Sequence, residues 1–255
     1  MRLALWQGAG VPGDLDGTVA EVARIADMAA NNGADLLVFP EGYLTGYYIP
    51  DLTKGGLPDV EAAFVKVANI AKCTGLVIAM GSHIDEQDGL RNAAVVFDAS
   101  GLELGRYHKR ALFGDWERKT FRAGRNPLRF CCAGLNVGVA ICYDVEFPEL
   151  IRCEAQAGVD LVIVPTALMA PHERIARLMV PTRAMENQIA LGYANRVGSE
   201  GPFDFVGLSS ICGPQGEPLA TAHTEPELLV AEIEPASIQR ERAAGSYLGT
   251  LAQLR

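Results

Sequence analysis

Short apolar segments alternate with segments of helical periodicity along the whole chain, and this alternation constrains the fold more than any other feature. Most of the apolar segments are too short to form helices, which is typical of buried strands. We therefore predict strands at residues 3–7, 36–39, 76–84, 92–98, 104–107, 129–132, 135–141, 161–164, 189–195, 209–212 and 228–233. Apolar spacing predicts helices at residues 18–32, 59–73, 147–157 and 173–187.

Local signals mark where several of these elements begin and end. Thr18 and Glu21 have the spacing of a capping box for the first helix, and Gly33 is placed to end it. Pro181 is expected to interrupt or restart the fourth helix. A long segment rich in Gly, Tyr and Pro, which reaches about Pro58, separates the second strand from the second helix.

The mixture of hairpins and strand–helix units predicts an α/β fold. Residues 129–132 and 135–141 are expected to pair as a hairpin, whereas other strands alternate with helices. We expect two mixed sheets packed together with helices outside, and a single doubly wound sheet is the alternative. The two halves of the chain have a similar rhythm without a sequence repeat. No linker divides them, so we expect residues 1–255 to form a single domain.

Composition disfavours several classes of partner. The chain carries 31 acidic and 22 basic residues for a net charge of −9, and its Lys and Arg residues form no basic stripe, so nucleic-acid binding is not expected. No apolar stretch is long enough to span a membrane, and the first residues lack the apolar core of a signal peptide. The six cysteines include no CxxC pair and no metal-like spacing with histidine. We expect a soluble cytoplasmic protein with reduced thiols, no metal and no cofactor.

One cysteine occupies a position where α/β folds place chemistry. Cys142 ends the apolar segment at 135–141 and precedes the polar and aromatic segment at 143–149. A reactive side chain between a buried strand and a helix lies at the edge of a sheet, where substrates bind. The alternative is a structural role, because a cysteine after an apolar strand is commonly a small core residue.

Three charged residues suit a cysteine nucleophile. Glu41 follows the second predicted strand, where desolvation would raise its pKa toward that of a general base. Lys109 follows the fifth predicted strand, and an ammonium beside a thiolate lowers the thiol pKa and stabilises an oxyanion. Glu117 is a candidate to orient Lys109 and balance its charge. The alternative for each of the three is an ordinary role on the solvated surface.

The histidines offer a rival mechanism. Only His108 lies in a plausible active-site loop, beside Lys109. No supporting Asn or Asp pattern accompanies it, so a papain-like Cys–His pair is disfavoured against a site built from cysteine, glutamate and lysine. The other histidines are His83, His172 and His223.

Three short motifs together carry a family resemblance. Phe39-Pro40-Glu41, His108-Lys109 and Ile141-Cys142-Tyr143-Asp144 occur in this order, and with them the chain resembles the nitrilase superfamily of carbon–nitrogen hydrolases. The resemblance spans nearly the whole chain. It implies a four-layer αββα sandwich whose subunits pair into a homodimer, and residues 1–255 would be one carbon–nitrogen hydrolase domain. Further matching segments lie at 113–117, 183–187, 194–198 and Ser246-Tyr247-Leu248.

The resemblance also implies a role for each matching residue. Cys142 matches the nucleophile, Glu41 the general base and Lys109 the oxyanion-stabilising lysine of a Glu-Lys-Cys triad. Glu117 matches a second glutamate that helps to position substrate and lysine, and the backbone N–H of Tyr143 matches another oxyanion donor.

The segment after the cysteine resembles amidase members more than true nitrilases, which tend to carry Trp-Glu there. The implied reaction is hydrolysis of a small aliphatic or cyclic carboxamide to the carboxylic acid and ammonia, through a cysteine thioester. Few residues follow Leu248, so we expect no long tail of the kind that builds filaments in some relatives.

Side chains near these motifs are candidates to shape the substrate site. Trp116, Tyr47 and Phe147 are expected to line an apolar pocket, and the alternative for each is packing in the core or in a subunit contact. Asp144 and Glu146 could attract an amine on the substrate, although Glu146 could equally bond backbone groups.

Three other functions are open. An enzyme of the same superfamily could use a nitrile, an ω-amide of a 2-oxo acid or an N-carbamoyl compound, with Arg110 and Arg174 as basic groups for a substrate carboxylate. A binding or regulatory protein on this fold is disfavoured, because all four catalytic positions are filled by the expected residue types. A thiol-redox role for Cys131 and Cys132 is disfavoured by their strand-like setting.

Overall fold

The first of two large sheets is built mainly from the first half of the chain. The computed structural model describes residues 1–245 and 247–254. The strands of this sheet are β1 (Arg2–Gln7), β2 (Leu36–Val38), β3 (Val77–Glu86), β4 (Gly89–Phe97), β5 (Glu103–His108) and β14 (Glu227–Glu232). Their order is β14-β1-β2-β3-β4-β5. β1, β2 and β3 run parallel, and the other neighbouring pairs are antiparallel.

The second sheet repeats this arrangement in the second half of the chain. Its strands are β6 (Arg129–Cys132), β7 (Leu135–Val139), β8 (Leu161–Pro165), β9 (Ala190–Ala194), β12 (Ser210–Cys212) and β13 (Pro218–Thr221). Their order is β13-β12-β9-β8-β7-β6, with β7, β8 and β9 parallel. Each sheet therefore has three adjacent parallel strands flanked by antiparallel ones, which accounts for the similar rhythm of the two halves.

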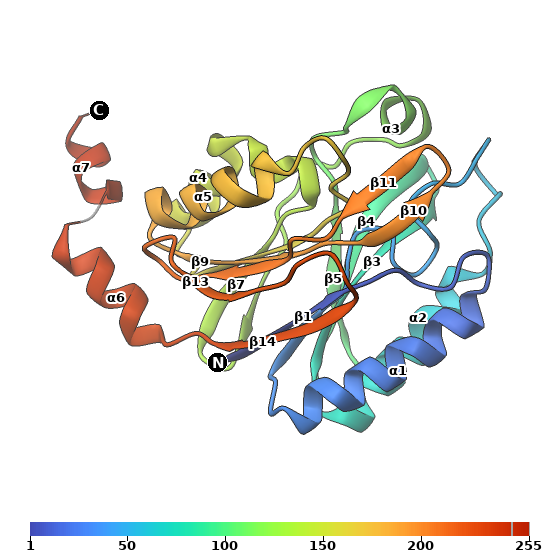
Figure 1. Ribbon diagram of the computed structural model, residues 1–255, viewed down its shortest axis with the longest axis horizontal. Coiled ribbons are helices and arrows are strands. Elements are labelled where there is room, and N and C mark those ends of the chain that lie inside the picture. Colours follow the sequence, from blue (N-terminus) through green and yellow to red (C-terminus); the bar gives the residue numbers. More distant parts are fainter. Residues whose placement is uncertain (246, 255) are drawn as a thin grey trace.

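The two sheets pack against each other, and helices cover their outer faces (Figure 1). In β1, Leu3 and Leu5 face the second sheet while Ala4 and Trp6 face the helices, as the alternation of a strand requires. The helices on the first sheet are α1 (Leu15–Asn31) and α2 (Val60–Thr74). Those on the second sheet are α4 (Pro148–Gln156) and α5 (Val180–Asn187). The predicted four-layer α/β sandwich is confirmed.

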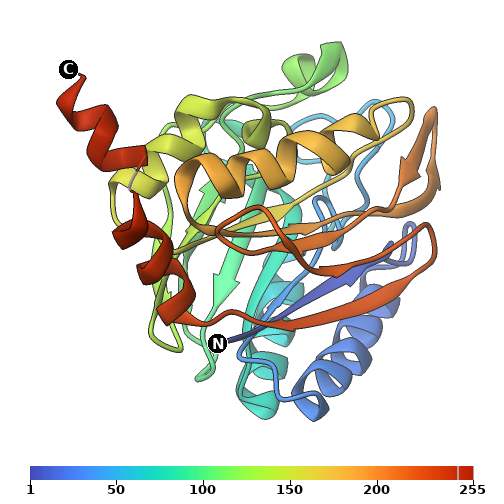
Figure 2. The same ribbon diagram turned by 60° about the vertical axis from the view of Figure 1, so that its left-hand side comes forward.

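The remaining elements lie at the edges of these layers. A hairpin of β10 (Val197–Glu200) and β11 (Phe203–Val206) follows β9. Two helices, α6 (Pro235–Ala244) and α7 (Tyr247–Gln253), extend along one side of the molecule, outside the layers (Figure 2). The short elements are α3 (Gly114–Thr120), the 3₁₀ helix η1 (Cys142–Glu146) and the π-helical turn η2 (Ile175–Met179). No helix in the described residues is long and apolar enough to cross a membrane.

Most strands agree with their predicted positions to within a few residues, but one helix start was wrong. We expected the first helix to begin with a capping box at Thr18, whereas α1 begins at Leu15 with Asp14 as its cap. The Asp14 side chain accepts the N–H of Gly17, and the Thr18 hydroxyl contacts the backbone of Val11 and Asp14 instead. Pro181 lies in the first turn of α5, where η2 ends, as predicted.

The elements that escaped prediction are short or weakly periodic. They are α3, the β10–β11 hairpin, β13, α6 and α7. β13 and the hairpin have few buried residues, so no clear period of two is visible in their sequences. The matching segment at 246–248 lies partly outside the described residues, because Ser246 is not among them.

Candidate active site

Cys142 lies on a sharp turn between the second sheet and α4. It follows the carboxyl end of β7 and begins η1. Its φ of 44° is in the left-handed region, which is costly for a non-glycine residue and is found where a nucleophile is held on a tight turn. Cys142 as a residue is partly exposed while its thiol is buried, and the backbone N–H of Ala167, just beyond β8, bonds to its sulfur. The turn therefore presents the thiol at the edge of the second sheet.

Glu41, Lys109 and Glu117 form a cluster whose side chains have 0% exposure. The Nζ atom of Lys109 lies 2.7 Å from Oε1 of Glu41 and 2.6 Å from Oε1 of Glu117. Asn92 on β4 donates through Nδ2 to Oε1 of Glu41 at 2.7 Å. The structure thus brings together three candidate residues from the loops after β2 and β5 and from α3, and adds a fourth residue that the sequence reading missed.

Two acceptor atoms and one N–H group of the cluster are not used within it. Oε2 of Glu41 and Oδ1 of Asn92 are buried and have no hydrogen-bond partner among the described residues, although Oε1 of Glu41 has two. Lys109 donates to two carboxylates, which leaves one of its three N–H groups for another acceptor. A buried polar atom without a partner is costly, so such atoms commonly serve function. The geometry leaves Oε2 of Glu41 as a proton acceptor and one N–H group of Lys109 as a donor for a reacting group.

The electrostatics of Cys142 keep its sulfur protonated until a base acts on it. Burial raises the thiol pKa well above its usual value, and the negative charge of Glu41 raises it further. Lys109 and the Ala167 amide oppose these effects without overcoming them. Burial also raises the pKa of Glu41, against the lowering effect of Lys109. A carboxylate with a raised pKa beside a neutral thiol is suited to accept its proton.

Lys109 itself remains a cation. Burial lowers its pKa, but the charges of Glu117 and Glu41 outweigh this effect and raise the pKa above that of a free lysine. Glu117 is held in turn by three donors besides Lys109. Its Oε2 accepts the backbone N–H of Phe113 at 2.7 Å, and its Oε1 accepts the hydroxyl of Tyr47 at 3.0 Å and, at 3.5 Å, the amide of Asn92. Glu117 therefore fixes the position of the lysine.

Tyr47 and Trp116 form an aromatic wall beside this cluster. Their ring centroids are 5.5 Å apart, and Tyr47 also meets the rings of Phe203 and Phe205 on the β10–β11 hairpin. The Tyr47 hydroxyl contacts Glu117, so one end of this wall reaches the charged residues. Tyr47 therefore packs against the hairpin and also contacts the charged cluster.

Asp144 has a different setting from the one we expected. Its Oδ2 accepts the Tyr107 hydroxyl at 2.8 Å and the Ile141 N–H at 2.9 Å. Its Oδ1 accepts the N–H groups of Ala111 at 2.7 Å and Arg110 at 3.2 Å. Both oxygens are occupied and the side chain is buried, so this geometry favours a positioning role over attraction of a substrate amine. Asp144 ties the cysteine turn to the loop that follows Lys109.

Tyr143 and Phe147 pack against each other after the cysteine turn. Their rings meet each other at 5.0 Å, and Tyr143 also meets Phe113. The Phe147 side chain is 37% exposed at the start of α4 and borders a surface cavity together with Arg110. The backbone N–H of Tyr143 lies in the first turn of η1, where helix N–H groups lack intrahelical partners.

Glu146 ends η1, four residues after Cys142 in the chain. It is partly buried, and its carboxylate has no hydrogen-bond partner in the part of the chain that the structure describes. Burial raises its pKa, while His172, Arg174 and Lys109 lower it. Glu146 therefore lies within electrostatic range of Lys109 and of the exposed Arg174.

The histidines and the paired cysteines do not form a rival site. Among the described residues, no histidine ring is hydrogen-bonded to Cys142. His108 pairs with Glu86 at 3.1 Å, and His83 contacts the Tyr47 carbonyl oxygen at 2.8 Å. Cys131 is exposed and Cys132 is buried on β6, so their side chains face opposite sides of the sheet.

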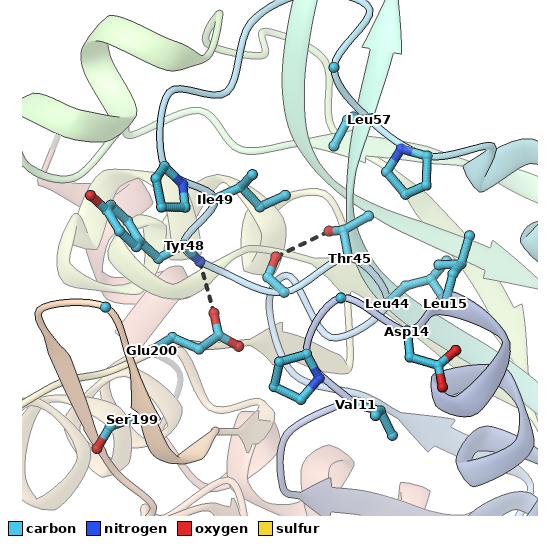
Figure 3. A pocket seen from close by; sticks show the side chains of 17 residues that line it. Val11, Asp14, Leu15, Leu44, Thr45, Tyr48, Ile49, Leu57, Ser199 and Glu200 are labelled. Atoms are coloured by element: carbon cyan, nitrogen blue, oxygen red, sulfur yellow. Dashed lines mark hydrogen bonds between the residues drawn. The ribbon is translucent and has the colours of Figure 1, made fainter.

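A cavity lies next to this site but does not contain it. It has a volume of about 770 Å³ and is lined by residues 11–15, 44–46, 48–50, 56–58 and 199–201. Figure 3 shows Tyr48, Thr45 and Glu200 along it, with the Glu200 carboxylate bonded to the Tyr48 amide. A cavity of this volume is large enough for a small ligand. It holds neither the thiol nor the Glu41–Lys109–Glu117 cluster, so we assign the chemistry to the cluster.

Comparison with known proteins places this site in a family. Residues 2–243 match the family model described as Carbon-nitrogen hydrolase. A protein of Pseudomonas protegens described as Hydrolase in pqqF 5′region is 36% identical over 252 residues, covering 97% of this chain and 88% of its own length. An (R)-stereoselective amidase from Pseudomonas sp. is 30% identical over 252 residues, covering 97% and 90%.

A solved structure shares the fold. The amidase from Nesterenkonia sp. superposes with a TM-score of 0.86 at 34% identity, covering 96% of this chain and 94% of its own. A variant of the amidase from Nesterenkonia sp. AN1 carries acrylamide added to its active-site cysteine. A cysteine nucleophile is thus documented in a protein with the same arrangement of sheets.

Proposed function

This chain belongs to the carbon–nitrogen hydrolase family of the nitrilase superfamily, and we propose that it is an amidase acting on a small aliphatic or cyclic carboxamide. The products would be the carboxylic acid and ammonia. One observation carries the proposal: the unpartnered Oε2 of the buried Glu41 is held beside a neutral thiol and a buried ammonium. This arrangement combines a base, a nucleophile and an oxyanion donor.

Acylation would begin with transfer of the Cys142 proton to Oε2 of Glu41. The sulfur attacks the amide carbon, and the carbonyl oxygen becomes an oxyanion. The free N–H of Lys109 and the N–H of Tyr143 would hold that oxyanion, each contributing roughly 3 kcal/mol to the transition state. When the carbon–nitrogen bond breaks, Glu41 returns the proton to the nitrogen, and ammonia leaves. A thioester on Cys142 remains.

Deacylation would reuse the same groups. Glu41 takes a proton from a water molecule, whose oxygen attacks the thioester carbon. The second oxyanion collapses, the carbon–sulfur bond breaks, and the thiolate takes the proton back from Glu41. The acid departs and the resting state is restored. Because Glu41, Lys109, Glu117 and Cys142 interact, the pH dependence would report macroscopic pKa values of the group rather than of one residue.

The substrate class is supported by the aromatic wall and by the amidase relatives. Tyr47 and Trp116 offer apolar surface next to the cluster, which suits a small carboxamide. Glu146 favours an amine on the substrate, whereas Arg174 would favour a carboxylate. A substrate panel must therefore contain neutral, cationic and anionic amides, together with matching nitriles and N-carbamoyl amino acids.

The test is ammonia release from this panel by the wild type and by Cys142→Ala, with Cys153→Ala as the control. Cys153 is an exposed free cysteine on α4, so its loss should leave activity unchanged. Release from carboxamides that disappears only in Cys142→Ala supports the proposal. Turnover of a nitrile or a carbamoyl compound in place of amides would overturn the substrate class but keep the nucleophile. Equal activity of Cys142→Ala would overturn the mechanism.

A further inference from the structure

A buried ion pair joins the second sheet to the loop that carries Glu41. Arg196 follows β9 and is 1% exposed, and its guanidinium pairs with the carboxylate of Glu200 at the end of β10. The aromatic ring of Phe205 lies under the guanidinium, 5.2 Å from its central carbon. Arg196 lies 155 positions after Glu41 in the sequence, yet its guanidinium donates to the carbonyl oxygen of Glu41.

Both partners of the pair bond to the same loop, at its two ends. Nη1 of Arg196 donates to the carbonyl oxygens of Glu41 at 3.3 Å and Gly42 at 3.1 Å. Oε2 of Glu200 accepts the backbone N–H groups of Tyr47 at 2.7 Å and Tyr48 at 2.9 Å. Figure 3 shows the second of these acceptor contacts. The loop between these contacts carries the proposed base at its start and, at its end, the tyrosine that bonds Glu117.

Stability alone does not explain a pair in this position. Moving two charges out of water costs several kcal/mol each, and apolar residues of similar volume are often as stabilising as a buried ion pair. A charged pair does offer fixed directional bonds, because a guanidinium and a carboxylate each bind two partners in a set geometry. All four backbone bonds of this pair go to residues 41–48.

We propose that Arg196 and Glu200 are positioning residues that hold the 41–48 loop so that Oε2 of Glu41 faces the Cys142 thiol. The proposal rests on the proposed function in one respect, because it takes Glu41 as the base for that thiol. Neither residue touches the reacting atoms. They act through the backbone of Glu41 and, through Tyr47, on Glu117. A displacement of the base by about 1 Å would reduce the rate by as much as 100-fold.

The test compares Glu200→Gln with Glu154→Gln. Glu200→Gln keeps the shape of the side chain but removes the negative charge that pairs with Arg196. Glu154 on α4 is the matched control, because it is also a buried glutamate that pairs with an arginine, and its hydrogen bonds go to Arg129 rather than to the 41–48 loop. Arg196→Lys is the second variant, since an ammonium lacks the planar fork that places Nη1 on the two loop carbonyls and Nη2 on Glu200.

The first readout is the rate of Cys142 alkylation by iodoacetamide as a function of pH, which needs no substrate. We expect Glu200→Gln and Arg196→Lys to slow alkylation at pH 7 by about tenfold to 100-fold and to move the profile to higher pH, toward that of a thiol without a base. The Glu154→Gln profile should superpose on the wild type, even if its melting temperature falls.

The second readout is ammonia release, in which kcat should fall more than KM changes. Superposition of the Glu200→Gln and Arg196→Lys alkylation profiles on the wild type would overturn the positioning role, whatever the activity. If the wild type turns over no amide, the proposed function fails, yet the alkylation profiles still decide the positioning role. If one variant does not fold, the other gives the same comparison.

Discussion

At the scale of single residues, the charge balance of the buried cluster explains why the thiol needs a base. One ammonium, that of Lys109, faces the two carboxylates of Glu41 and Glu117. With a neutral thiol the cluster carries one net negative charge, and a thiolate would make two. The raised pKa of Cys142 reflects this repulsion together with burial. The thiolate can therefore form only as Glu41 becomes protonated, which couples nucleophile activation to the base.

Lys109→Ala should remove more than an oxyanion donor. We expect kcat to fall about 100- to 1,000-fold, as for loss of one such donor. The Lys109 charge also lowers the Glu41 pKa, so its removal raises that pKa. Since the base must be deprotonated, the acidic limb of the kcat/KM profile should move to higher pH. A pH profile of ammonia release measures both effects.

Lys119→Ala is the matched control for this prediction. Lys119 is exposed on α3, near Glu117 in sequence but outside the cluster. Its removal should leave the rate and the pH profile unchanged. An unshifted acidic limb in Lys109→Ala would contradict the assignment of the limb to Glu41.

At the scale of elements, the segment that carries Glu41 lies directly against β3. A Cβ atom at Gly81 would lie 2.0 Å from the carbonyl oxygen of Pro40 and 2.8 Å from Cα of Glu41. Because these are backbone atoms, the clash can be relieved only if the segment that carries Glu41 moves away from β3. Gly81→Ala should reduce kcat/KM by about tenfold to 100-fold through displacement of the base. It should also lower the free energy of unfolding by about 1–3 kcal/mol, as for overpacking.

Steady-state kinetics and denaturant unfolding of Gly81→Ala check this expectation. Gly245→Ala is the control, because a Cβ atom there meets no atom within 4 Å. A Gly81→Ala enzyme with unchanged kinetics would show that the Glu41 segment can move without cost to the reaction.

The local pattern of the sequence predicts groups that follow strand ends, but not groups that meet through strand pairing. Glu41 and Cys142 each follow an apolar strand, so their setting is readable from neighbouring residues. Asn92 contacts Glu41 from β4, which reaches it only through the parallel β2–β3 and antiparallel β3–β4 pairings. Its one local signal is a polar residue at the start of an apolar strand.

Arg196 and Asp144 are two further residues whose contacts the local sequence does not predict. The contact of Arg196 with the Glu41 loop spans the two halves of the chain, and no local period encodes it. Asp144 was expected to face the substrate because it follows the cysteine, but a 3₁₀ turn directs its carboxylate back to the Ile141 N–H. The spacing of residues predicts where a side chain lies along the sequence, but the backbone conformation of the turn determines the direction in which it points.

At the scale of the whole molecule, the candidate site needs both sheets. Glu41, Asn92 and Lys109 come from the first sheet and its loops, whereas Cys142 and Ala167 follow strands of the second. Arg196 and Asp144 provide bonds between the two groups. Conditions that separate the two sheets should therefore abolish activity before the helices unfold. The activity thus depends on the stability of the contact between the sheets.

His83 predicts how this stability changes with pH. It lies on β3 with 0% exposure, and burial lowers its pKa from 6.5 to about 4. The unfolded chain binds a proton at this residue below pH 6.5, whereas the folded chain does so only below about pH 4. Stability should therefore fall as the pH decreases through this window. The shift corresponds to about 3 kcal/mol in the free energy of unfolding.

Denaturant unfolding of the wild type and His83→Gln at several pH values between 7 and 4 isolates this effect. Glutamine keeps a donor for the Tyr47 carbonyl oxygen but does not titrate, so its stability should depend less on pH. The advantage of the wild type over His83→Gln should be largest at pH 7 and should shrink, or reverse, toward pH 4. Parallel curves for the wild type and His83→Gln would mean that His83 is not the group whose protonation opposes the folded state.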